Sequence, residues 1–152
     1  NYKSLMPCNM YGPGDSYDLK KSHFFSALIK KIYLASKTKK KTVTIWGTGK
    51  PKRELLYVED FADAVLYFLN KKIKQPFLNI GTGKDYTIRW YANFISKQIN
   101  SKIKFKFNTK MPDGIQRKVL NISLSKKYGW KAKTSLMDGF KHTFSDYLQN
   151  NR

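Results

Sequence analysis

The feature that most constrains the fold is an alternation of short strand patterns with amphipathic helical patterns. Strand candidates at residues 4–6, 42–46, 53–58, 77–80 and 103–107 are interspersed with helical patterns at 23–35, 59–69, 87–99 and 136–148. This order predicts an α/β fold. In the second helix, the apolar residues recur at helical spacing, so we expect a buried stripe of Phe61, Ala62, Val65, Leu66 and Leu69.

Composition limits what the chain can be. Its 152 residues suffice for one unit with its own core, and no apolar run approaches the ~20 residues that a membrane span needs. The single cysteine, Cys8, has no disulfide partner within the chain, which predicts a reducing, cytoplasmic setting. Since His23 and His142 are also far apart in sequence, we expect no metal site.

The net charge of +20 raises the alternative of a nucleic-acid-binding module, because a basic surface attracts phosphates. However, only four of the 30 basic residues are Arg, the residue that reads bases and phosphates with a bidentate fork. Lysines occur in every segment and no nucleic-acid recognition motif is present. The sequence favours a lysine-coated surface over a nucleic-acid site.

Two glycine turns have the outline of phosphate-binding loops. Gly81-Thr82-Gly83 follows a strand and precedes a helix, but Tyr86 stands where a dinucleotide fingerprint has its third glycine. Gly47-Thr48-Gly49 is followed by a proline and by no helix. Neither turn predicts a dinucleotide site.

Loops at the strand ends carry the side chains that a base, a ribose, a diphosphate and a sugar would need: His23, Trp46, Arg53 and Asp113. Taken singly, each has a structural explanation. Arg53 beside Glu54, for example, fits a surface ion pair.

Several motifs together resemble one family. Residues 7–15 read Pro-Cys-Asn-Met-Tyr-Gly-Pro-Gly-Asp, residues 22–23 Ser-His, residues 46–49 Trp-Gly-Thr-Gly and residues 112–114 Pro-Asp-Gly. They resemble the second half of the GDP-L-fucose synthases, which are extended short-chain dehydrogenases/reductases. The resemblance implies a C-terminal, substrate-binding portion that completes a Rossmann-type sheet and forms the smaller α/β domain. Residues 1–152 are then expected to form a single unit, without the N-terminal NADP-binding half.

The resemblance also implies a reaction: NADPH-dependent 3,5-epimerisation and 4-reduction of GDP-4-keto-6-deoxy-D-mannose to GDP-L-fucose. His23 matches the acid/base histidine of the family, and histidine is the side chain that most often serves as a general acid or base. The expected contacts to NADP(H) are Pro7, Cys8, Asn9, Met10 and His23. The expected contacts to the GDP-sugar are Lys31, Trp46, Arg53 and Asp113.

We expect the full-length enzyme to be a homodimer with no membrane association. The family's cofactor fingerprint, Ser and Tyr-x-x-x-Lys are expected before residue 1, so the chain by itself should be inactive. A fragment of another nucleotide-sugar epimerase or dehydratase is the alternative within the same class.

Overall fold

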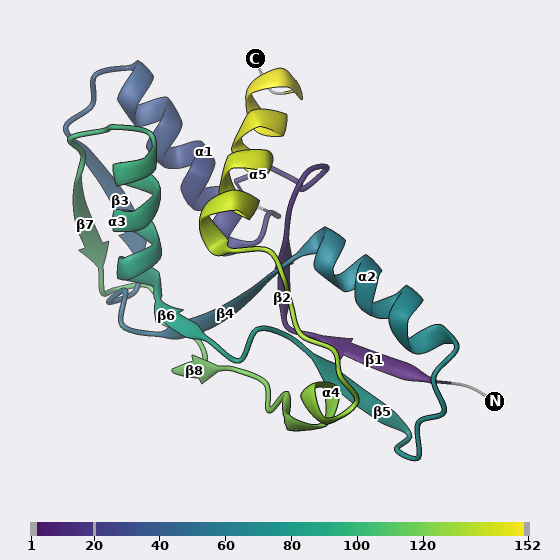
Figure 1. The fold of residues 1–152 in the computed structure, drawn as a ribbon. Helices are drawn as coiled ribbons and strands as arrows, with labels where there is room; N and C mark the ends of the chain where they lie inside the picture. Colours follow the sequence, from purple (N-terminus) through teal and green to yellow (C-terminus); the bar gives the residue numbers. More distant parts are fainter. Residues whose placement is uncertain (1–2, 20, 151–152) are drawn as a thin grey trace. The chain divides into compact units, whose positions relative to one another are not determined.

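The computed structural model describes residues 3–19 and 21–150 (Figure 1). The chain divides into two compact units. Unit 1 draws on residues 1–14, 54–85 and 118–152, and unit 2 on residues 15–53 and 86–117. The sequence was interpreted as one unit. Because each unit is assembled from segments far apart in the chain, no linker marks the division.

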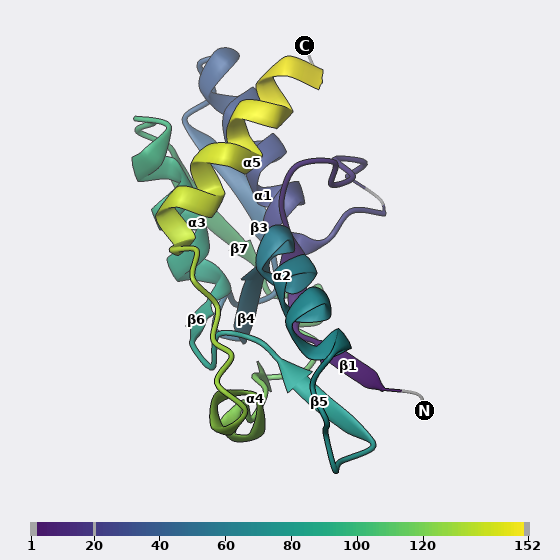
Figure 2. The same cartoon turned by 45° about the vertical axis from the view of Figure 1, so that its right-hand side comes forward.

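Unit 1 is built on short parallel strand pairs. β1 (Ser4–Pro7) pairs with β5 (Phe77–Ile80), and β2 (Asn9–Tyr11) pairs with β4 (Lys52–Tyr57) in the register Asn9 to Leu55. The helix α2 (Val58–Leu69) follows β4 directly and runs alongside β1, as Figure 1 and Figure 2 both show. These parallel pairs confirm the predicted α/β class.

The remaining helices of unit 1 are α4 (Ser123–Lys127) and α5 (Leu136–Asn150). The core is formed by seven buried residues: Cys8, Leu56, Ala64, Phe68, Leu78, Ile80 and Trp130. Trp130 donates from Nε1 to Asp63 Oδ2 at 2.9 Å, which ties the segment after α4 to α2. Among the described helices, none is long and apolar enough to cross a membrane.

The buried stripe predicted for α2 is wrong. The buried residues of this helix are Asp60, Ala64 and Phe68, whereas Leu66 and Leu69 are 70% and 63% exposed. The predicted helix is present, and the predicted residues do share one of its faces. The core of unit 1, however, packs against the adjacent face, which carries Asp60, Ala64 and Phe68. Ala62 and Val65 are exposed as well, and Phe61 is only partly buried.

Unit 2 holds α1 (Phe24–Lys37), β3 (Thr42–Trp46), α3 (Ile88–Gln98) and β7 (Lys104–Asn108). β3 and β7 are parallel, with Val43 opposite Phe105. α1 packs against both β3 and α3, and the rings of Phe24 and Phe25 lie 5.5 and 5.7 Å from that of Tyr91. Thr87 caps α3 by accepting from the backbone N–H of Trp90 at 3.0 Å.

Three short strands were not predicted: β2 (Asn9–Tyr11), β6 (Asp85–Thr87) and β8 (Arg117–Lys118). All three pair with β4. The chain crosses from one unit to the other within β4, β6 and β8. Their two or three residues are too short to show a strand period.

Candidate functional site

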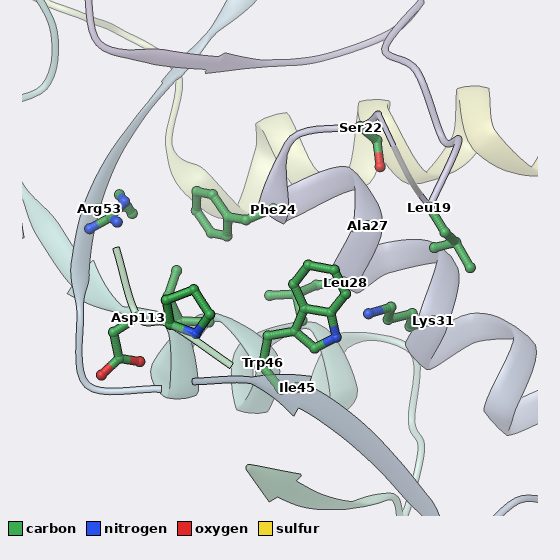
Figure 3. Close-up of a pocket in the computed structure, with 12 residues that line it drawn as sticks. Leu19, Ser22, Phe24, Ala27, Leu28, Lys31, Ile45, Trp46, Arg53 and Asp113 are labelled. Carbon is green, nitrogen blue, oxygen red and sulfur yellow. The ribbon is translucent and has the colours of Figure 1, made fainter. Parts of the chain in front are cut away.

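Unit 2 contains a cavity of about 320 Å³, shown in Figure 3. This volume falls in the range of small-molecule sites. Its apolar wall is formed by Leu19, Phe24, Ala27, Leu28, Ile45, Ile88 and Pro112. Ser22, Lys31, Trp46, Arg53 and Asp113 complete the lining. An apolar cavity with a few polar groups at its edge suits a ligand with both an apolar face and charges.

The four residues predicted to contact the substrate therefore line one cavity, although they lie in four different segments. Lys31 comes from α1, Trp46 from the end of β3, Arg53 from β4 and Asp113 from the turn that precedes β8. The Trp46 side chain is 63% exposed, and Lys31 Nζ points toward its ring at 5.7 Å from the centroid (Figure 3). An exposed indole with an ammonium beside it offers stacking and positive charge together. The role of these four residues in binding stays a prediction.

Arg53 is held in place by backbone carbonyls. Its Nη1 donates to Ile115 O at 2.6 Å and to Lys52 O at 2.8 Å. The surface ion pair with Glu54 is wrong as an interpretation, because the Glu54 side chain is fully buried while Arg53 is partly exposed. Successive side chains of a strand point to opposite faces, so these neighbours cannot meet.

Asp113 is engaged by the turn between β3 and β4. Its Oδ1 accepts from the backbone N–H of Thr48 at 2.6 Å and its Oδ2 accepts from Thr48 Oγ1 at 2.7 Å. These bonds to Thr48 hold the pKa of the Asp113 carboxyl below its ordinary value. Asp113 therefore stays ionised and contributes negative charge to this edge of the cavity.

His23 lies at the entrance to α1 and its side chain is exposed. Its two neighbours, Ser22 and Phe24, both line the cavity, whereas His23 is not among the lining residues. Its carbonyl accepts the N–H of Ala27 at 3.0 Å, so the backbone is fixed as the start of the helix. The acid/base role of His23 stays a prediction.

The predicted cofactor-binding residues 7–10 belong to unit 1. Cys8 packs in the core, and burial together with the nearby Glu54 carboxylate raises the pKa of its thiol to about 12. Asn9 Nδ2 donates to Glu54 O at 3.1 Å, and Met10 is 36% exposed. The Cys8 side chain is buried, and its backbone N–H donates to Ile80 O at 3.1 Å.

Glu54 is the residue of this region that sequence reasoning missed. Its Oε1 accepts from the N–H of Gly83 at 2.6 Å, and its Oε2 accepts from the N–H of Leu120 at 2.7 Å. A Cβ added at Gly81 would overlap Oε1. The Gly-Thr-Gly turn at residues 81–83 thus wraps a carboxylate of the protein rather than a phosphate.

Among the residues that the structure describes, no group of three or more His, Cys, Asp or Glu side chains is placed to hold a metal ion.

Comparisons with known proteins identify relatives across the whole chain. It is 40% identical over 148 residues to GDP-L-colitose synthase of Yersinia pseudotuberculosis, covering 97% of this chain and 48% of that protein. It is 37% identical over 147 residues to GDP-L-fucose synthase 1 of Arabidopsis thaliana, covering 97% of this chain and 46% of that protein. The chain thus spans about half the length of the curated relatives it matches.

A solved structure is also similar to almost the whole chain. The chain is similar to a GDP-6-OMe-4-keto-L-xylo-heptose reductase from C. jejuni, with a TM-score of 0.89 and 29% sequence identity over 99% of this chain and 55% of that chain. The sequence profile of the NAD dependent epimerase/dehydratase family matches residues 1–81, which is more than half of the 152 residues. The chain therefore belongs to the NAD dependent epimerase/dehydratase family.

Proposed function

We propose that the cavity of unit 2 binds a GDP-sugar, and that this chain is the substrate-binding portion of an NADP-dependent epimerase/reductase that forms GDP-L-fucose or a related GDP-6-deoxysugar. The observation that carries the proposal is the convergence of Lys31, Trp46 and Arg53 on one cavity. Relatives that align over 97% of the chain are named as GDP-L-fucose and GDP-L-colitose synthases.

The chemistry of the lining matches the parts of such a ligand. Lys31 and Arg53 supply positive charge for a diphosphate, and the exposed face of Trp46 offers a planar surface for a base or for the apolar face of a sugar. Arg53 is positioned by two backbone carbonyls before the ligand arrives, which lowers the entropy lost on binding. His23 would exchange the protons at C3 and C5, since protons beside a carbonyl are acidified by enolate formation.

NADPH, when bound, supplies the hydride that reduces C4. From this chain, residues 7–10 of unit 1 would line its nicotinamide end, with the half-buried Pro7 and Asn9 and the more exposed Met10 offering the surface. The rest of the cofactor site would come from an N-terminal half like that of the longer relatives. We therefore expect the 152-residue chain alone to bind the GDP-sugar and not to oxidise NADPH.

Calorimetric titration of the 152-residue chain with GDP-mannose tests the binding proposal. We expect saturable binding that free GDP displaces and that generic RNA does not. Arg53→Met should weaken it by about tenfold to a hundredfold, because it removes a charge-assisted contact worth about 1.5–3 kcal/mol. Trp46→Ala should weaken it by about twofold to tenfold, because it removes a stacking contact worth about 0.5–1.5 kcal/mol.

Lys97→Met is the matched control for Arg53→Met, since Lys97 is an exposed cation of the same unit outside the cavity lining. It should bind like the wild type. Circular dichroism establishes that each variant is folded. Absence of binding to the folded wild type, or equal affinities for all variants, would contradict the proposal. Displacement by RNA with a steep salt dependence would favour the nucleic-acid module instead.

A further inference from the structure

The Gly47-Thr48-Gly49 turn, which matches no phosphate-binding motif, has a specific geometry in unit 2. Both glycines adopt positive φ, at 72° for Gly47 and 73° for Gly49. A Cβ added at Gly47 would overlap Asp113 Oδ1, and one added at Gly49 would overlap the Phe107 ring. The two glycines therefore let the backbone of Thr48 approach Asp113 and β7 closely.

Thr48 is held on all its polar groups. Its N–H and its hydroxyl both donate to the Asp113 carboxylate, at 2.6 and 2.7 Å. Its carbonyl accepts from Arg89 Nη2 at 3.2 Å. A turn residue that is bound through its N–H, its side chain and its carbonyl has little freedom left.

Arg89 is itself fixed at the start of α3. Its guanidinium lies 3.7 Å from the centroid of the Phe107 ring, and its backbone N–H donates to Gly49 O at 3.0 Å. The N–H of Ile88 donates to Pro51 O at 2.9 Å. The first turn of α3 thus holds the 49–51 segment through backbone bonds.

This turn connects two walls of the cavity. Trp46 precedes it directly, and Arg53 follows it within β4. The stretch of chain that carries Asp113 also contacts β4. Arg53 Nη1 donates to Ile115 O at 2.6 Å, and the backbone N–H of Lys52 donates to Gln116 O at 2.8 Å. Loosening the turn would therefore displace the stacking surface and the guanidinium together.

We propose that Thr48 and Arg89 are positioning residues of the cavity, which fix Trp46 and Arg53 for the ligand through the Asp113 carboxylate and the 47–49 turn. The inference rests on the proposed function, because it takes a GDP-sugar as the ligand of this cavity. Neither residue lines the cavity. Their effect on affinity comes from preorganisation, since a turn that must be ordered on binding lowers the affinity.

The test measures the dissociation constant of GDP-mannose for the full 152-residue chain. Thr48→Val keeps the shape of the side chain and removes the hydroxyl donor, and should weaken binding about tenfold, the effect of one lost hydrogen bond to a charged group. Thr48→Ser keeps the donor and should stay within about twofold of the wild type. Thr109→Val makes the same change at an exposed threonine of unit 2 and should leave the affinity unchanged.

A double-mutant cycle separates positioning from a general loss of stability. In an Asp113→Asn background, Thr48→Val should have little further effect on the dissociation constant, because the two residues act as one contact. Arg89→Met leaves the Thr48–Asp113 contact in place and should weaken binding severalfold by itself, which provides a reading even if Thr48→Val does not fold. Wild-type binding with unchanged affinity in Thr48→Val and Arg89→Met would overturn the inference and leave the proposed function standing. No binding by the folded wild type would overturn the proposed function itself.

Discussion

Replacement of the buried glutamate, Glu54→Gln, should destabilise the chain strongly. The Glu54 side chain is fully buried, and its two oxygens accept from the N–H groups of Gly83 at 2.6 Å and Leu120 at 2.7 Å. Glutamine has the same shape but only one acceptor oxygen, so its amide must turn an N–H₂ group toward one of these two donors. That donor is left buried and unsatisfied.

The loss combines one charge-assisted hydrogen bond with one buried donor that has no partner. Each is worth roughly 1–3 kcal/mol, and relief of the buried charge offsets part of it, so we expect a net loss of about 2–4 kcal/mol. For a chain of this length, about 2–4 °C per kcal/mol translates this into a Tm lower by roughly 5–15 °C.

Urea unfolding followed by circular dichroism measures the change. The control is Glu59→Gln, at the only other glutamate, which is exposed in the first turn of α2 and should cost less than about 1 kcal/mol. If Glu54→Gln costs no more than Glu59→Gln, the two backbone bonds do not stabilise unit 1 and the reasoning is refuted.

Three further predictions concern Cys8, Asp113 and α2. Burial and Glu54 raise the pKa of the Cys8 thiol to about 12. Iodoacetamide at about pH 8 should therefore leave Cys8 of the folded chain unmodified and should alkylate it in denaturant. Rapid alkylation of the folded chain would contradict the burial of Cys8. Thr48 lowers the pKa of Asp113, so this carboxylate contributes stability above the unfolded pKa of about 3.9 and loses it as pH falls through the lower folded pKa. The urea midpoint of Asp113→Asn should therefore lie below that of the wild type near neutral pH and converge with it in acid, whereas a difference that is constant with pH would argue against the contact. In α2, Leu66→Ser should change the free energy of unfolding by less than about 0.5 kcal/mol, whereas Phe68→Ala should lower it by about 3–5 kcal/mol. Similar losses for the two variants would indicate that Leu66 is buried, and would contradict the packing of α2.

Elements that are marked by a short, clear sequence pattern were predicted correctly. The strands at 42–46 and 77–80 were predicted with the bounds that the structure has, because β-branched and apolar residues there are bounded by glycine turns. The Ser-x-x-Asp spacing of residues 135–138 is typical of a helix start, and Ser135 Oγ accepts the N–H of Asp138 at 3.1 Å at the start of α5.

The properties that depend on distant segments were not predicted. The burial of Glu54 depends on Gly83 and on Leu120, which lies 66 positions further along the chain. The exposure of Leu66 and Leu69 depends on which face of α2 meets the strands of unit 1. Neither the burial of Glu54 nor the exposure of these leucines follows from composition or periodicity. A glutamate beside an arginine is more often exposed, and an apolar stripe on a helix is more often buried.

The residue types in the loops, together with the resemblance, predicted which residues form the candidate site, but not the contacts that hold them in place. Lys31, Trp46, Arg53 and Asp113 do line one cavity. What the sequence did not indicate is that the Asp113 carboxylate bonds to Thr48, because that contact joins two turns 65 residues apart. In the sequence, the glycines that permit it indicate only the outline of a phosphate-binding loop and a match to the Trp-Gly-Thr-Gly motif of the family.

Hydrogen exchange of the 152-residue chain with and without GDP-mannose tests the central claim most directly. We expect slower exchange in the segments that form the cavity, at residues 22–31, 45–53 and 112–116, with α2 unchanged. Protection confined to α2, or no protection at saturating GDP-mannose, would contradict the assignment of this cavity to a GDP-sugar.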